Sequence, residues 1–178
     1  MKRPAALFFL LAVHTAAHAH DVRALGAHVH GQATVDLALD QGALELALQA
    51  PGIGILDFER PAATGAERAA LARAIAVLKS GNWVTLPTAA HCRLASSSAR
   101  ADGFDATTPA APAGQHRHAG FSASLQYRCA NPAALRALVV RLPAQFPGLH
   151  EVIVNTATDH GQGRSVLTAG NLRVVLAP

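Results

Sequence analysis

The chain has little charge, few aromatic residues and only two cysteines, and each shortage excludes a class of protein. Of its 178 residues, 15% are charged and 51% are hydrophobic, which is too apolar for a disordered chain. Two cysteines are too few for a cysteine-rich zinc module or a small disulfide-stapled protein. No run reaches the ~18 apolar residues of a membrane span, which argues against stable membrane insertion. With 4% aromatic residues and arginines scattered singly, the chain lacks the features of a nucleic-acid-binding surface.

Residues 1–19 have the pattern of a cleaved signal peptide. Lys2 and Arg3 precede a short apolar run, and Ala17 and Ala19 occupy the small-residue positions before a cleavage site. We expect cleavage after Ala19 and export from the cytoplasm. Residues 20–178 should then form a single domain, because a typical domain has roughly 150 residues. A buried N-terminal helix is the alternative interpretation of this segment.

Alternation of apolar and polar residues predicts an antiparallel β-hairpin near the start of the domain. Residues 33–39 and 44–49 alternate, and a turn at residues 40–42 joins them. A helix should begin at Thr64, because Thr64 and Glu67 fit a capping box, and it should end at Gly81. Residues 121–129 are the clearest further strand.

Weaker patterns complete a predicted α+β fold. Residues 88–96 are a candidate strand, residues 97–119 indicate a mobile loop, and Asn131 begins a short helix through Leu138. Further strands are expected at residues 138–142, 151–156, 164–168 and 172–176. The order of elements favours a mostly antiparallel β-sheet with one longer and one short helix packed against it.

The two cysteines, Cys92 and Cys129, lie on the two candidate strands that flank the loop. In an exported chain such a pair is most simply a disulfide, and closing this loop would stabilise the fold by roughly 4 kcal/mol. A metal-binding or catalytic pair is the alternative, although it would normally have closer spacing, as in Cys-x-x-Cys.

Ten histidines stand against eleven acidic and fifteen basic residues, and this excess is the main clue to function. His28 and His30 lead directly into the first strand, in phase with its polar positions, so both imidazoles should share one face. His116 and His118 precede the strand at residues 121–129 in the same way. If these two strands are neighbours, the four nitrogens can hold one tetrahedral zinc ion, Zn²⁺. If they are not, each pair needs a water, a carboxylate or another histidine; incidental surface histidines are the alternative.

Other histidines are weaker candidates. His20 would be the mature N-terminus and can chelate a metal through both its amine and its ring. Cleavage after Ala17 would place His20 third in the chain, a geometry suited to copper(II) or nickel(II). His160, in a predicted turn, is a candidate outer ligand, while His91 and His150 are as consistent with structural roles as with metal binding.

The sequence contains none of the common catalytic motifs. There is no His-Glu-x-x-His, no Gly-x-Ser-x-Gly and no phosphate-binding glycine-rich loop before a helix. A small metallohydrolase would need a metal-bound water and a nearby carboxylate, for which Glu59 is the candidate. The pattern therefore favours binding over catalysis.

Several segments, taken in order, resemble the ZrgA-like proteins, a family associated with periplasmic zinc binding and zinc uptake beside an ABC-type zinc importer. The resemblance covers about residues 20–176 and rests on the order of its motifs. These are His28–Gly31 before an alternating strand, Pro51 with Leu56–Glu59, the helix start at Thr64 and Glu67, residues 86–92 ending at Cys92, the loop histidines before a strand ending at Cys129, Phe146–Gly148, and Gly161 with Gln162.

The resemblance implies that His28 and His30 are the family's leading His-x-His and that His116 and His118 are the remnant of its histidine-rich loop. It also implies a disulfide between Cys92 and Cys129. The chain departs from the family pattern by keeping only two loop histidines, and by carrying Gly120 and Arg60 where an acidic residue and a histidine are expected. These departures imply a weaker or lost loop site.

The leading hypothesis is a periplasmic zinc-binding accessory protein that captures or buffers zinc through neutral imidazoles and passes it to an ABC-type importer. Protonated imidazoles cannot bind metal, so we expect affinity to fall below pH ~6. The alternative is a non-catalytic envelope module that contacts a protein partner through its sheet, with incidental histidines.

Overall fold

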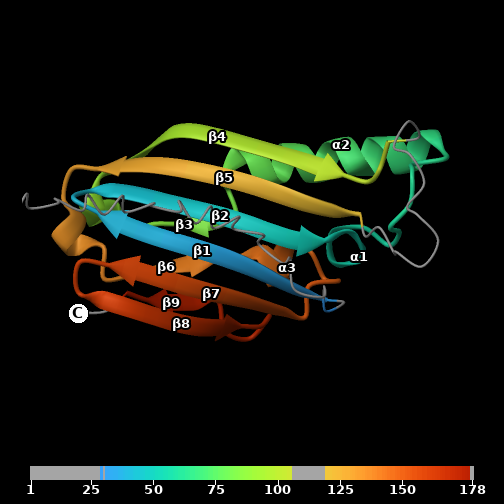
Figure 1. Ribbon diagram of the computed structural model, residues 1–178. Coiled ribbons are helices and arrows are strands. Elements are labelled where there is room, and N and C mark those ends of the chain that lie inside the picture. The colour runs from blue at the N-terminus through green and yellow to red at the C-terminus, as the bar shows by residue number, and fades with distance from the viewer. Residues whose placement is uncertain (1–28, 30, 106–118, 177–178) are drawn as a thin grey trace, which may run out of the picture.

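The computed structural model describes residues 29, 31–105 and 119–176, and a six-stranded β-sheet is its largest part (Figure 1). The strands of this sheet lie in the order β4 (Cys92–Asp102), β5 (Gly120–Cys129), β2 (Ala43–Pro51), β1 (Gln32–Asp40), β7 (Glu151–Thr158) and β8 (Gly161–Leu167). A smaller sheet has the order β3 (Val84–Thr85), β6 (Ala137–Val140) and β9 (Arg173–Val175). The helices are α1 (Gly52–Ile55), α2 (Gly65–Ser80) and α3 (Leu142–Gln145), with 3₁₀ turns η1 (Thr88–Ala90) and η2 (Pro132–Ala134).

The predicted hairpin is confirmed as β1 and β2. Val35 and Leu37 are buried while Asp36 between them is exposed, as the period of two requires. Leu37 lies opposite Leu46 of β2, and Leu46 lies opposite Leu125 of β5. The inward faces of three adjacent strands therefore form one continuous apolar surface.

Almost every strand pair is antiparallel, which confirms the α+β prediction of a mostly antiparallel sheet. The exception is β1, which pairs with β7 in parallel, with Gln32 opposite Glu151. The sequence pattern does not predict this pairing, because alternation indicates which face a strand buries and not which neighbour it takes. Its consequence is that β1 and β7 begin at the same end of the sheet.

Helix α2 and the smaller sheet cover the inner face of the large sheet and close a single hydrophobic core (Figure 1). The predicted capping box is confirmed: the Thr64 hydroxyl accepts from the Glu67 N–H, and the Glu67 carboxylate accepts from the Thr64 N–H. Arg60 donates to both oxygens of Glu67 and lies over the Phe58 ring, so it holds the helix start. The helix ends at Gly81, which has φ +73°.

The disulfide between Cys92 and Cys129 is confirmed, and it joins directly opposed residues of β4 and β5. Two neighbouring predictions are wrong. Residues 97–102 belong to β4 rather than to a loop, because this edge strand is held by backbone pairing to β5 and needs few apolar side chains. The segment before Cys92 forms η1 instead of a strand.

The prediction of a short helix from Asn131 through Leu138 is also wrong in its length. Only η2 is helical, and β6 begins at Ala137 because its side chains are needed in the core. Predicted strands at residues 151–156, 164–168 and 172–176 correspond to β7, β8 and β9, with small shifts at their ends.

Replacing Glu67 and measuring stability at several pH values tests whether the Glu67 carboxylate stabilises the start of α2. Hydrogen bonds from Arg60 and from the Thr64 and Ala63 amides hold the pKa of Glu67 at about 2, below its ordinary value of 4.5. This stabilisation is complete at a pH above the pKa that Glu67 has in the unfolded chain. It is lost as the pH falls through the lower pKa that Glu67 has in the folded protein. We expect Glu67→Gln to lower the urea midpoint at neutral pH, with the difference narrowing toward pH 2. Glu45→Gln, on the exposed face of β2, is the control; a pH-independent difference for Glu67→Gln would contradict the explanation.

Replacing both cysteines tests the disulfide. Alanine is preferred because Cys129 is buried, and a hydroxyl there would lack a partner. We expect Cys92→Ala/Cys129→Ala to lower the free energy of unfolding by roughly 4 kcal/mol. Urea denaturation with and without a dithiol measures this, since reduction should destabilise the unmodified chain and leave the variant unchanged. A variant as stable as the oxidised chain would refute a stabilising role.

Candidate functional site

Three strands of the large sheet begin at one end, which we call the strand-start end. β1 and β5 are each antiparallel to β2, and β7 is parallel to β1, so all three run in the same direction. They begin at Gln32, Gly120 and Glu151, beside α1 (Figure 1). In the sequence, His30, His118 and His150 each lie one or two residues before one of these strand starts.

The strands β1 and β5 are not neighbours, because β2 lies between them. The two histidine pairs therefore do not precede neighbouring strands, which the sharing of one zinc ion between adjacent strands would require. Two strand spacings separate the starts of β1 and β5, which is about 10 Å. The five histidines His20, His28, His30, His116 and His118 lie outside the described residues.

A tight turn precedes β1. The Gln32 N–H donates to the Val29 carbonyl at 3.0 Å, and Gly31 has φ +77°, the conformation that a glycine supplies in such turns. β1 therefore begins at Gln32 and does not include Gly31. The prediction that His28 and His30 share one face stays a prediction, because both residues lie outside the described part of the chain.

Helix α1 ties the other chain segments together at this end. The Gly52 N–H donates to the Ala119 carbonyl at 2.8 Å, which fixes the residue after His118. On its other side α1 contacts Gly148, where an added Cβ would lie 2.8 Å from the Gly54 oxygen. The Ile53 N–H donates to the Glu59 carboxylate at 3.0 Å, so Glu59 has a structural role in holding α1.

The three described histidines divide between the two ends of the sheet. His150 lies at the strand-start end, while His91 and His160 lie at the opposite end, next to the disulfide and in the β7–β8 turn. β7 has 8 residues. At about 3.3 Å per residue, His160 is more than ~25 Å from the strand starts and can share no ion with a site there. Its nearest carboxylate is Asp159, 3.6 Å from its Nε2 atom.

A hollow at the opposite end of the sheet is lined by positively charged side chains. A hollow of about 900 Å³ beside the disulfide is lined by Arg93 and Arg128, which lie directly opposite each other, and by His91. Two facing guanidinium groups disfavour a cation at this position. Among the described residues, no three His, Cys, Asp or Glu side chains are placed to hold a metal ion.

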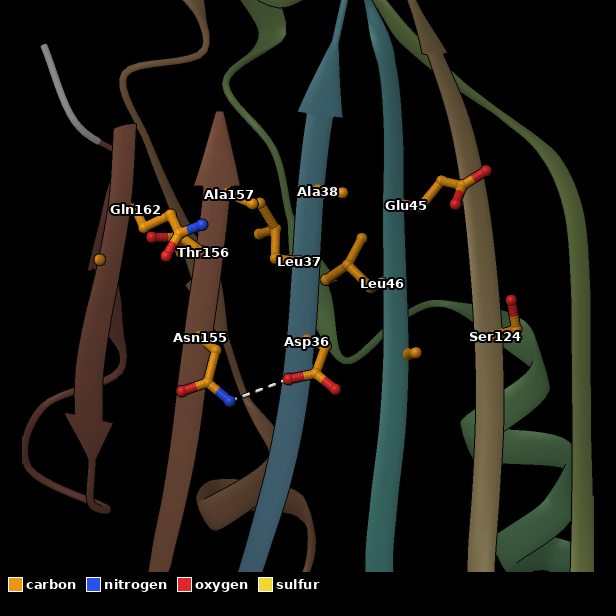
Figure 2. A pocket seen from close by; sticks show the side chains of 12 residues that line it. Asp36, Leu37, Ala38, Glu45, Leu46, Ser124, Asn155, Thr156, Ala157 and Gln162 are labelled. Atoms are coloured by element: carbon orange, nitrogen blue, oxygen red, sulfur yellow. Dashed lines mark hydrogen bonds between the residues drawn. The ribbon is translucent and has the colours of Figure 1, made fainter. Parts of the chain in front are cut away.

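A trough of about 500 Å³ crosses the outer face of the sheet, the face turned away from the core (Figure 2). Its floor consists of small side chains, including Ala38, Ala47 and Ser124. Asn155 donates to the Asp36 carboxylate at 2.8 Å across β1 and β7. No histidine lines this trough, and sequence reasoning missed it, although the small residues at outward positions of adjacent strands were a usable signal.

The described fold is that of an α+β sheet protein with one disulfide. Three of its strands follow histidines in the sequence and begin at the same end of the sheet. The chain belongs to the ZrgA family of zinc uptake proteins, whose family description matches residues 27–176. No curated protein matches the sequence. Within the described residues, no helix is long and apolar enough to cross a membrane.

The glycine at position 31 provides a test of how this end is assembled. An added Cβ would lie 2.8 Å from the His150 Cδ2 atom and 3.2 Å from the Gly148 oxygen, in a backbone conformation that disfavours side chains. We expect Gly31→Ala to lower the free energy of unfolding by about 1–3 kcal/mol in urea denaturation. Gly65→Ala, where nothing lies within 4 Å, is the matched control and should be nearly neutral. Equal stabilities for the two variants would disprove the close packing.

Proposed function

We propose that this protein captures zinc outside the cytoplasm through imidazoles at the strand-start end and supplies it to an ABC-type zinc importer. The observation that carries the proposal is that β1, β5 and β7 begin together, each after a histidine in the sequence. Membership of a zinc uptake family supports the choice of metal. The role proposed is binding and transfer without catalysis.

The anchoring of the two histidine pairs supports this choice of site. His30 precedes Gly31, which is fixed by the turn before β1, and His118 precedes Ala119, which is fixed by α1. These anchors are about 10 Å apart across β2. Because β1 and β5 are not neighbours, we propose that each histidine pair binds zinc separately, with a water, a carboxylate or another histidine completing the coordination.

The proposed location is the periplasm. The disulfide fits an extracytoplasmic protein, because such bonds persist in oxidising compartments. Residues 1–19, the proposed signal peptide, lie outside the described residues.

Calorimetric zinc titration of protein purified from the periplasm, without a histidine tag, tests the proposal. The variants are His28→Ala/His30→Ala and His116→Ala/His118→Ala, with His91→Ala and His160→Ala as controls at the opposite end. Outer partners of zinc ligands contribute 10–100-fold to affinity, so removing direct ligands should cost at least about tenfold. We expect this loss in the first double variant and not in the controls. Unchanged affinity in both double variants would rule out the proposed site.

A second candidate function follows from the outer-face trough. Its floor of small side chains leaves a depression into which a partner's side chains fit, as expected of an envelope interaction module. Capture of a protein partner that is unaffected by a metal chelator would favour this alternative over zinc capture.

A further inference from the structure

Two arginines face each other beside the disulfide, at the end of the sheet opposite to the strand-start end. Arg93 of β4 and Arg128 of β5 are directly opposed in the strand register, one position from the pair of disulfide cysteines. Side chains at opposed positions of an antiparallel pair share one face, with Cβ atoms about 4.5–5.5 Å apart. Both arginines and His91 line the same hollow of about 900 Å³.

No carboxylate in the described part of the chain neutralises this arginine pair. Arg93 and Arg128 are exposed, and neither side chain has an ion pair or a hydrogen bond there. Glu45 lies one diagonal position from Arg128 on the same face, and its carboxylate accepts from the Gln126 amide at 3.4 Å. Like charges directly opposite each other destabilise a sheet, so stability does not explain the pair.

Hydrogen bonds fix the backbone around this hollow before any ligand binds. The His91 carbonyl accepts from the Ala130 N–H at 3.3 Å, and the Ala90 carbonyl accepts from the Asn131 N–H at 3.1 Å. The Asn131 side chain also donates to the Ala89 carbonyl at 3.0 Å. His91 has φ +49°, a strained conformation that persists only where the surrounding structure holds it. A site ordered in advance loses less entropy when a partner binds.

The hollow combines charge with apolar surface. A guanidinium group donates two parallel hydrogen bonds to a carboxylate or phosphate, which makes arginine well suited to recognise such groups. The half-buried side chains of Leu86 and Pro87 line the same hollow. Exposed charge pairs are worth little singly, so a free phosphate ion gains little here. Arginine beside apolar side chains is instead typical of a protein interface.

We infer that this hollow is a docking site for an acidic segment of a partner protein. Aspartate or glutamate side chains of that segment accept hydrogen bonds from Arg93 and Arg128, and its apolar side chains cover Leu86 and Pro87. A partner docked here leaves the strand-start end accessible, because the two lie at opposite ends of the sheet. The inference does not depend on the proposed function.

Binding of a synthetic hexaglutamate peptide to the full exported chain, measured by calorimetry, tests the inference. We expect Arg93→Gln/Arg128→Gln to lower the affinity at least about tenfold, because hydrogen bonds between charged groups are lost. Arg164→Gln/Arg173→Gln is the matched control, since it removes the same charge from exposed positions elsewhere and should keep most of the affinity. Equal losses in the two double variants, or no binding of the peptide to the unmodified chain, would overturn the inference.

Inorganic phosphate, titrated in the same way, distinguishes the two sources of an anionic group. We expect it to bind the unmodified chain at least about tenfold more weakly than the peptide, because a single ion makes fewer contacts. Phosphate that binds as tightly as hexaglutamate would indicate a small-ion site and would overturn the assignment to a partner protein.

The stability of the single variants separates a binding role from a structural one. Removing one of two opposed like charges should leave the urea midpoint unchanged or raise it at low ionic strength, and salt should reduce any increase. A lower midpoint for both Arg93→Gln and Arg128→Gln would show that the arginines stabilise the fold, and it would overturn the inference.

Discussion

The parallel pairing of β1 with β7 determines which residues of this protein can meet. Its register places Gln32 opposite Glu151, residues that are 119 apart in the sequence. Because the two strands run in the same direction, the segments that precede them lie at one end of the sheet. If β7 were antiparallel to β1, His150 would lie beside the end of β1 instead of beside its start. The arrangement at the strand-start end therefore depends on this one ladder.

The two ends of the sheet are held by different interactions. The opposite end carries the disulfide, where Cys92 and Cys129 join the beginning of β4 to the end of β5. Facing arginines beside that bond make the region unfavourable for a cation. The strand-start end is instead held by hydrogen bonds of the Gly31 and Ala119 carbonyls. Stabilisation by a covalent bond at one end leaves the other end to be shaped around the proposed zinc site.

Local features of the fold were predictable from the sequence, and its pairings were not. The capping box at Thr64 and Glu67 and the alternation around Val35 depend on neighbouring residues, so the sequence shows them directly. The order of strands depends on contacts between distant segments, which a period of two does not encode. The strand at residues 97–102 was missed for a related reason, since an edge strand rich in serine and alanine is held by its backbone.

In the candidate site, too, the sequence showed local patterns but not the contacts between distant segments. Histidine spacing indicated zinc chemistry, whereas the turn at Gly31 and the contacts that its carbonyl makes with His150 and Glu151 could not be read from the sequence. His150 had no local pattern to distinguish it, because its position beside Gly31 arises only from the β1–β7 register. The most direct test is anomalous diffraction at the zinc edge from crystals of the zinc-loaded protein. The account predicts a zinc peak at the strand-start end, beside the turn at Gly31. A protein whose zinc lay only beside His91 or His160, or in the outer-face trough, would contradict it.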